Sequence, residues 1–181
     1  MFDTILGLPM HALVVHATVV VVPTAALAVA LASSWARFRR WAGFLPLLLS
    51  AIAVVLVPVS TSSGEALQQR VGSSALVERH AHLADGLLLP VLVLVVAAVA
   101  VYWVHLKERA VDGPGGRAAR MVVGVGGPGR PGAAVMAVVS LVAAVGVIAT
   151  VVQVARIGHS GAEAAWSKVA AQAVPTRNAG K

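Results

Sequence analysis

Four long apolar stretches, separated by polar segments, dominate the sequence. They cover about residues 8–32, 42–60, 86–106 and 133–155. A helix rises about 1.5 Å per residue, so roughly 20 apolar residues cross a hydrocarbon core of about 30 Å. The pattern therefore predicts an all-α integral membrane protein that forms a single domain over residues 1–181. We expect its four transmembrane helices to pack as an up-down-up-down bundle.

The polar segments predict an orientation in the membrane. Residues 35–41 contain Arg37, Arg39 and Arg40 between two tryptophans, and residues 110–132 are rich in Gly, Pro and Arg. Positive residues concentrate in cytoplasmic loops, and Trp is enriched at membrane interfaces. We therefore expect both segments in the cytoplasm, the second as a mobile loop. Both chain termini are then expected on the extracytoplasmic side of the cell membrane.

A polar segment, residues 73–85, precedes the third apolar stretch. Ser73 and Ser74 are both suitable N-caps, so we expect a continuous helix to start here and to run through residue 106. Its first turns are expected outside the membrane. In the first helix, Pro9 suits the first turn, where a missing N–H costs nothing.

Composition supports a membrane protein and narrows its function. The chain is 59% hydrophobic and only 12% charged, whereas soluble domains carry about 25% charged residues. Because Cys is absent, disulfides, thiolate catalysis, cysteine-held iron–sulfur clusters and covalent haem attachment are excluded. The positive charge behind the net +7 lies mainly in the two cytoplasmic connections. We therefore attribute it to topology and expect the lipid bilayer, and no nucleic acid, as a partner.

Histidines recur near the helix ends that are expected to face outward. Counting about 20 residues from each cytoplasmic helix end places His11, His80 and His159 at a similar height, about 8–9 Å above the membrane boundary. One histidine at a helix end is usually solvated or hydrogen-bonded, but imidazoles from three helices at one height make a metal or haem site equally plausible. The candidate ligands are His11, His16, His80 and His159, with Glu65 and Glu163 as nearby carboxylates.

Two further histidines are left out of the predicted site. His82 points about 200° around the helix from His80, because each residue advances about 100°. His105 lies at the opposite membrane face beside Lys107, where we expect its side chain to reach the interface.

The first hypothesis for function is a membrane-embedded haem b protein that transfers electrons at the outer face of the membrane. Two imidazoles on facing helices would bind the haem iron, and the ligands, burial and hydrogen bonds would set its potential. Spacing leaves the ligand pair open between His11 with His80 and His16 with either His80 or His159.

The second hypothesis is a non-haem site for zinc, copper or iron. Three imidazoles, from His11, His80 and His159, with Glu65 or Glu163 as an oxygen ligand, suit these ions. We favour haem, because four histidines exceed what one structural ion needs.

The third hypothesis is an accessory or structural subunit, without a cofactor, of a larger membrane complex such as a respiratory assembly. The many Ala and Gly residues of the third and fourth spans support it, because small residues let membrane helices approach closely. A redox complex and a second copy of the chain are therefore both compatible partners. No nucleophile elbow or nucleotide-binding glycine loop is present, so a hydrolytic enzyme has little support.

Four sequence motifs carry a resemblance to a known family. They are GLPMHALVVH at residues 7–16, VPVSTSSGE at 57–65, LVERH at 76–80 and VARIGHSGAEAAW at 154–166. With these motifs the chain resembles the DUF2231 family of small bacterial membrane proteins, along nearly its whole length. The resemblance implies that His11, His16, His80 and His159 are the family's histidines, and Ala12 stands where the family has Pro. Some relatives look fused to Rieske-type domains, and this resemblance implies a function in electron transfer.

Overall fold

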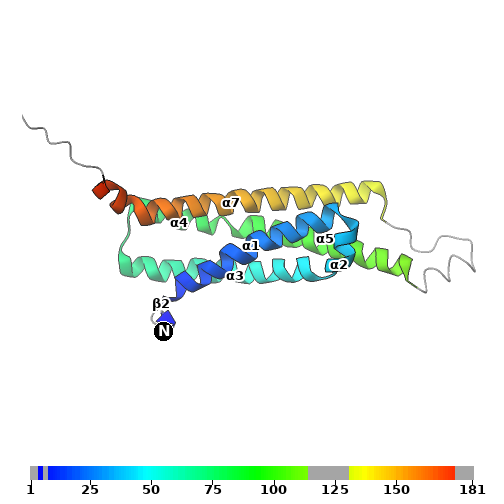
Figure 1. The fold of residues 1–181 in the computed structure, drawn as a ribbon, viewed down its shortest axis with the longest axis horizontal. Coiled ribbons are helices and arrows are strands. Elements are labelled where there is room, and N and C mark those ends of the chain that lie inside the picture. Colours follow the sequence, from blue (N-terminus) through cyan, green and yellow to red (C-terminus); the bar gives the residue numbers. More distant parts are fainter. Residues whose placement is uncertain (1–3, 6–7, 114–130, 174–181) are drawn as a thin grey trace, which may run out of the picture.

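The computed structural model describes residues 4–5, 8–113 and 131–173, which form a bundle of long helices (Figure 1). The four longest, α1, α3, α5 and α7, alternate in direction; each packs on its neighbours in sequence, and α7 packs on α1. This confirms the predicted all-α up-down-up-down bundle. The described elements are β1 (Thr4–Ile5), β2 (Leu8–Pro9), α1 (Met10–Ser34), α2 (Ala36–Ala42), α3 (Leu45–Val71), α4 (Ala75–Asp85), α5 (Leu88–Asp112) and α7 (Ala133–Ala173).

The four predicted membrane spans are present as helices. In the described part of the chain, 4 helical segments are long and apolar enough to cross a membrane. They are Met10–Ser34, Leu45–Arg70, Ala75–Asp112 and Ala133–Ser167. The mobile loop predicted at residues 110–132 lies outside the described residues except for its two ends.

Small side chains form the centre of the bundle. Ala25, Ala26, Ala97 and Ala98 are fully buried there. Gly146 of α7 lies against the backbone of α5, because a Cβ on this residue would stand 3.1 Å from the backbone nitrogen of Leu94. Lipid tails are as apolar as leucine, so membrane helices associate by close packing of this kind. The large apolar residues mostly remain on the outside, where lipid would contact them.

The start of the first helix and the first connection differ from the sequence prediction. Leu8–Pro9 forms β2 and pairs with β1, so α1 begins at Met10 and Pro9 is not in its first turn. The connection at residues 35–41 is a short helix, α2, which ends at Gly43. Gly43 has φ 57°, a left-handed conformation that glycine adopts without a steric penalty.

One arginine of this connection has a structural role. Arg39 is buried and binds both carboxylate oxygens of Glu108 on α5, at 2.7 and 3.2 Å. It also donates to the backbone oxygen of Ala32 at 2.6 Å. A planar guanidinium matches a carboxylate in this two-pronged way, so Arg39 ties α2 to α5 and to the end of α1.

The helix expected to run through residues 73–106 is interrupted. Ser74 is the N-cap of α4, and its side chain accepts a hydrogen bond from the Val77 N–H, as predicted. α4 then ends at Asp85, and α5 begins at Leu88. Pro90 explains the break, since it has no N–H for the carbonyl four residues earlier and its ring crowds that carbonyl. At this break, the side-chain amide of Gln153 on α7 donates a hydrogen bond to the Leu83 carbonyl oxygen at 2.6 Å.

Candidate functional site

A cavity of about 610 Å³ lies between α1, α3, α4 and α7, at the end of the bundle where α1 begins and α7 ends. We call this the histidine end; it is on the left in Figure 1. Val57, Leu87 and Val154 contribute apolar walls. Glu65 and Asp85 line the cavity as exposed carboxylates. Two of the candidate histidines, His11 and His80, also line it, and they come from different helices.

The first turn of α1 carries His11. Its Nδ1 is 3.1 Å from the Ser63 hydroxyl oxygen and 3.2 Å from the Ser60 carbonyl oxygen, both on α3. The Ser63 hydroxyl itself donates to the Ser60 carbonyl oxygen at 2.9 Å. A carbonyl can only accept a hydrogen bond, and the hydroxyl proton is already used. Nδ1 of His11 is therefore the protonated ring nitrogen.

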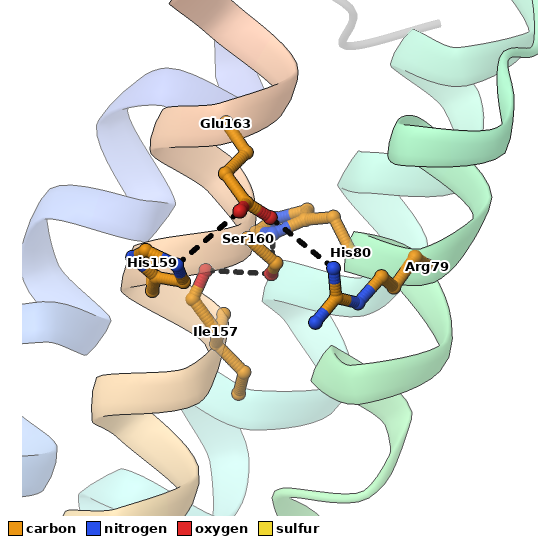
Figure 2. Close-up of polar contacts among 6 residues, drawn as sticks. All are labelled: Arg79, His80, Ile157, His159, Ser160 and Glu163. Atoms are coloured by element: carbon orange, nitrogen blue, oxygen red, sulfur yellow. Dashed lines mark hydrogen bonds and ion pairs between the residues drawn. The ribbon is translucent and has the colours of Figure 1, made fainter.

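His80 of α4 is held in the same way by α7 (Figure 2). Its Nδ1 is 3.1 Å from the Ser160 hydroxyl oxygen. That hydroxyl donates to the Ile157 carbonyl oxygen at 3.0 Å, so it accepts from the imidazole. With the hydroxyl proton used in this way, the arrangement favours a proton on Nδ1 of His80 as well.

This tautomer leaves a lone pair on Nε2 of each ring. Among the described residues, none forms a hydrogen bond with Nε2 of His11 or His80. Neutral imidazole with one nitrogen free is the usual protein ligand of metals, and the hydrogen bond of the other nitrogen decides which atom binds. Each ring can therefore offer one Nε2 lone pair, and both rings line the same cavity.

A glycine supports each ring. A Cβ on Gly64 would be 3.0 Å from Cε1 of His11, and a Cβ on Gly161 would be 3.0 Å from Cε1 of His80. Each glycine follows the serine that binds the same ring, in the Ser-Gly pairs at 63–64 and 160–161. The α1–α3 pair and the α4–α7 pair thus present equivalent units. The repeated Ser-Gly dipeptide was the sequence signal for these residues, and the sequence prediction missed it.

Three other candidate ligands lie away from the cavity. The side chain of His159 is 74% exposed, and its Nε2 lies 3.3 Å from a carboxylate oxygen of Glu163. The other Glu163 oxygen is 3.2 Å from the Arg79 guanidinium (Figure 2). His16 is exposed, and its Nδ1 donates to the Ala12 carbonyl oxygen of its own helix at 2.5 Å.

The predicted ligands do not gather as one cluster. Within the described residues, no three His, Asp or Glu side chains lie close enough together to hold a metal ion. His82 is exposed, in keeping with its omission from the predicted site.

His105 lies at the expected end of the bundle, but the prediction that its side chain reaches the interface was wrong. Its side chain is buried, with 4% of its surface exposed, and stacks on Tyr102 with ring centroids 6.0 Å apart. Gly43 packs beside its Nε2, so the turn after α2 covers the ring and keeps it from the interface. It lies at the opposite end of the bundle from the cavity.

The family model described as predicted membrane protein (DUF2231) matches residues 7–173. The chain belongs to the DUF2231 family. The match contains both cavity histidines and both Ser-Gly pairs of this DUF2231 protein. With its four apolar helices, it is a multi-pass membrane protein whose surface contacts the lipid bilayer. No curated protein and no solved structure matches the chain.

Proposed function

We propose that this DUF2231 protein binds one haem b through Nε2 of His11 and of His80, and that it transfers electrons in the membrane. The observation that supports this most is the pair of equivalent imidazoles that line one cavity from opposite halves of the bundle. His11 and His80 would hold the haem iron between them, because histidine is a usual protein ligand of haem iron and each ring has a free Nε2.

The cavity supports haem over a single ion. Its volume of about 610 Å³ is within the range of about 300–1,000 Å³ that is usual for small-molecule and cofactor sites. Most of its lining is apolar, as a macrocycle requires. A site with three imidazoles would need His159, which is 74% exposed and instead pairs with Glu163.

The chain itself would contribute binding, orientation and tuning. His11 and His80 would hold the iron, the Ser-Gly pairs would hold the rings, and the apolar walls would exclude water from the macrocycle. Haem supplies one-electron chemistry when it is bound, and axial ligands and burial set its potential. The partner is then a redox protein or complex that exchanges single electrons at the histidine end.

A visible spectrum of the purified protein tests this function. Protein expressed with an adequate haem supply and purified without chelator should show an intense Soret band and about one haem per chain. Dithionite should sharpen the visible bands, as expected for six-coordinate iron with two imidazole ligands. Stoichiometric zinc or copper without a Soret band would contradict haem and favour the non-haem site. Absence of both would favour the accessory subunit.

We also propose that the histidine end and both termini are extracytoplasmic. The exposed Arg37 and Arg40 lie in α2 at the other end of the bundle, close in sequence to exposed Trp35 and Trp41. Arginine beside interfacial tryptophan is typical of the cytoplasmic side. A periplasm-specific enzyme reporter fused after the last residue should therefore be active, and a cytoplasm-specific reporter inactive. The reverse result would place the cavity in the cytoplasm.

A further inference from the structure

We propose that Ser63 and Ser160 are positioning residues that hold the two cavity histidines in the Nδ1–H tautomer, and that Ser160 has the larger effect. For its consequences on a cofactor, this inference rests on the function proposed above. The tautomer itself is a property of the cofactor-free chain and is testable without haem.

The Ser63 and Ser160 hydroxyls donate their protons in a defined direction. Each serine donates its single proton to the carbonyl three residues earlier in its own helix, at 2.9 Å for Ser63 and 3.0 Å for Ser160. The oxygen can then only accept from the histidine ring. In the alternative tautomer the hydroxyl would have to turn from its carbonyl and donate to the ring nitrogen 3.1 Å away, so the bond from the serine to that carbonyl would be lost. Each serine therefore selects the form in which Nε2 is free.

Burial makes this selection strong. Ser63 is 6% exposed and Ser160 is 2% exposed, so water does not readily replace either hydroxyl. The ring N–H groups that they bind are part-buried, and an N–H shielded from water is unfavourable without an acceptor. Removal of the hydroxyl should thus turn the ring or move its proton to Nε2, and both changes take the lone pair away from the cavity.

The two halves differ in one respect. Nδ1 of His11 has a second acceptor, the Ser60 carbonyl oxygen at 3.2 Å, which a side-chain substitution leaves in place. Among the described residues, Nδ1 of His80 has only the Ser160 hydroxyl. Loss of the Ser63 hydroxyl is therefore partly compensated, whereas loss of the Ser160 hydroxyl is not.

The test compares Ser160→Ala with Ser63→Ala. In cofactor-free protein above about pH 8, where imidazoles are neutral, ¹⁵N NMR should show the Nδ1–H form for His11 and His80. Ser160→Ala should convert a substantial fraction of His80 to the Nε2–H form and weaken haem binding by about 10–100-fold, the usual cost of losing a group that orients a ligand. It should also raise the midpoint potential of bound haem. Ser63→Ala should cause a smaller change in each quantity.

Two variants separate positioning from folding. Ser62→Ala is the matched control, because among the described residues the exposed Ser62 hydroxyl bonds the Pro58 carbonyl and forms no hydrogen bond with a histidine. It should leave tautomer, affinity and potential unchanged. Ser160→Thr keeps the hydroxyl and should restore the Nδ1–H form of His80. An Nε2–H form of His80 in the wild type, or an unchanged tautomer in folded Ser160→Ala, would overturn the inference. If the wild type binds no haem but its tautomers follow this pattern, only the proposed function fails.

Discussion

Replacement of His11 or of His80 by alanine should remove the Soret band from the purified protein, whereas His159→Ala should retain it. Each cavity ring would supply one of the two proposed imidazole ligands, and no other described histidine lines the cavity to replace it. Loss of a group that merely orients a ligand costs about 10–100-fold in affinity, so loss of a ligand should exceed this range. The measurement is haem content per chain, from the Soret absorbance of protein purified in parallel.

His159→Ala and His16→Ala are the matched controls for these variants. Both remove a histidine that is close in sequence to the residues of the cavity. However, His159 pairs with Glu163, and His16 forms a hydrogen bond with a carbonyl of its own helix. Each control should keep its haem within about twofold of the wild type, which is less than 1 kcal/mol at 25 °C. If His159→Ala lost haem while His80→Ala kept it, the ligand pair would be wrong.

Gly161→Val should displace His80 from the cavity and prevent haem binding without unfolding the bundle. Even the Cβ of Gly161→Ala would stand 3.0 Å from Cε1 and 3.2 Å from Nδ1 of His80, so the ring must shift. The two further methyl groups of valine enlarge this shift. We expect about a tenfold loss of haem affinity for Gly161→Ala and undetectable binding for Gly161→Val, with similar but separate effects at Gly64 on His11.

The thermal stability of cofactor-free Gly161→Ala should not fall, although its haem affinity does. Alanine favours a helix interior over glycine by about 1 kcal/mol, so thermal unfolding of the cofactor-free protein should be unchanged or delayed. Gly158→Ala is the control, because its Cβ would meet nothing within 4 Å although Gly158 lines the same cavity. Equal haem loss in Gly158→Ala and Gly161→Ala would mean that cavity volume, not ring position, limits binding.

The heights of the histidines followed from the sequence, but their directions did not. Position along a helix fixes height at about 1.5 Å per residue, and this correctly suggested that His11 and His80 lie at the same end of the bundle. Direction depends on how each helix is rotated in the bundle. His159 and Ser160 differ by one residue and hence by about 100°. In the bundle, Ser160 therefore faces His80, and His159 faces solvent beside Glu163.

The break between α4 and α5 was also hidden in the sequence. Pro90 lies inside an apolar stretch where membrane helices commonly tolerate proline, so a continuous helix was the simpler expectation. The interruption is stabilised from another helix, through the bond from Gln153 to the Leu83 carbonyl. His105 shows the same limitation, because the turn at Gly43 that covers it belongs to a different part of the chain.

The sequence by itself determined the membrane class, the four spans, their alternating direction and the family. These depend on apolar length and on residue motifs, which are local properties of the chain. Only the tertiary structure decided which histidines share the cavity, which ring nitrogen is protonated and which glycines support the rings. Those depend on the rotation of each helix against its neighbours and on partners 52 and 80 residues away in the sequence, since no local pattern fixes such pairs.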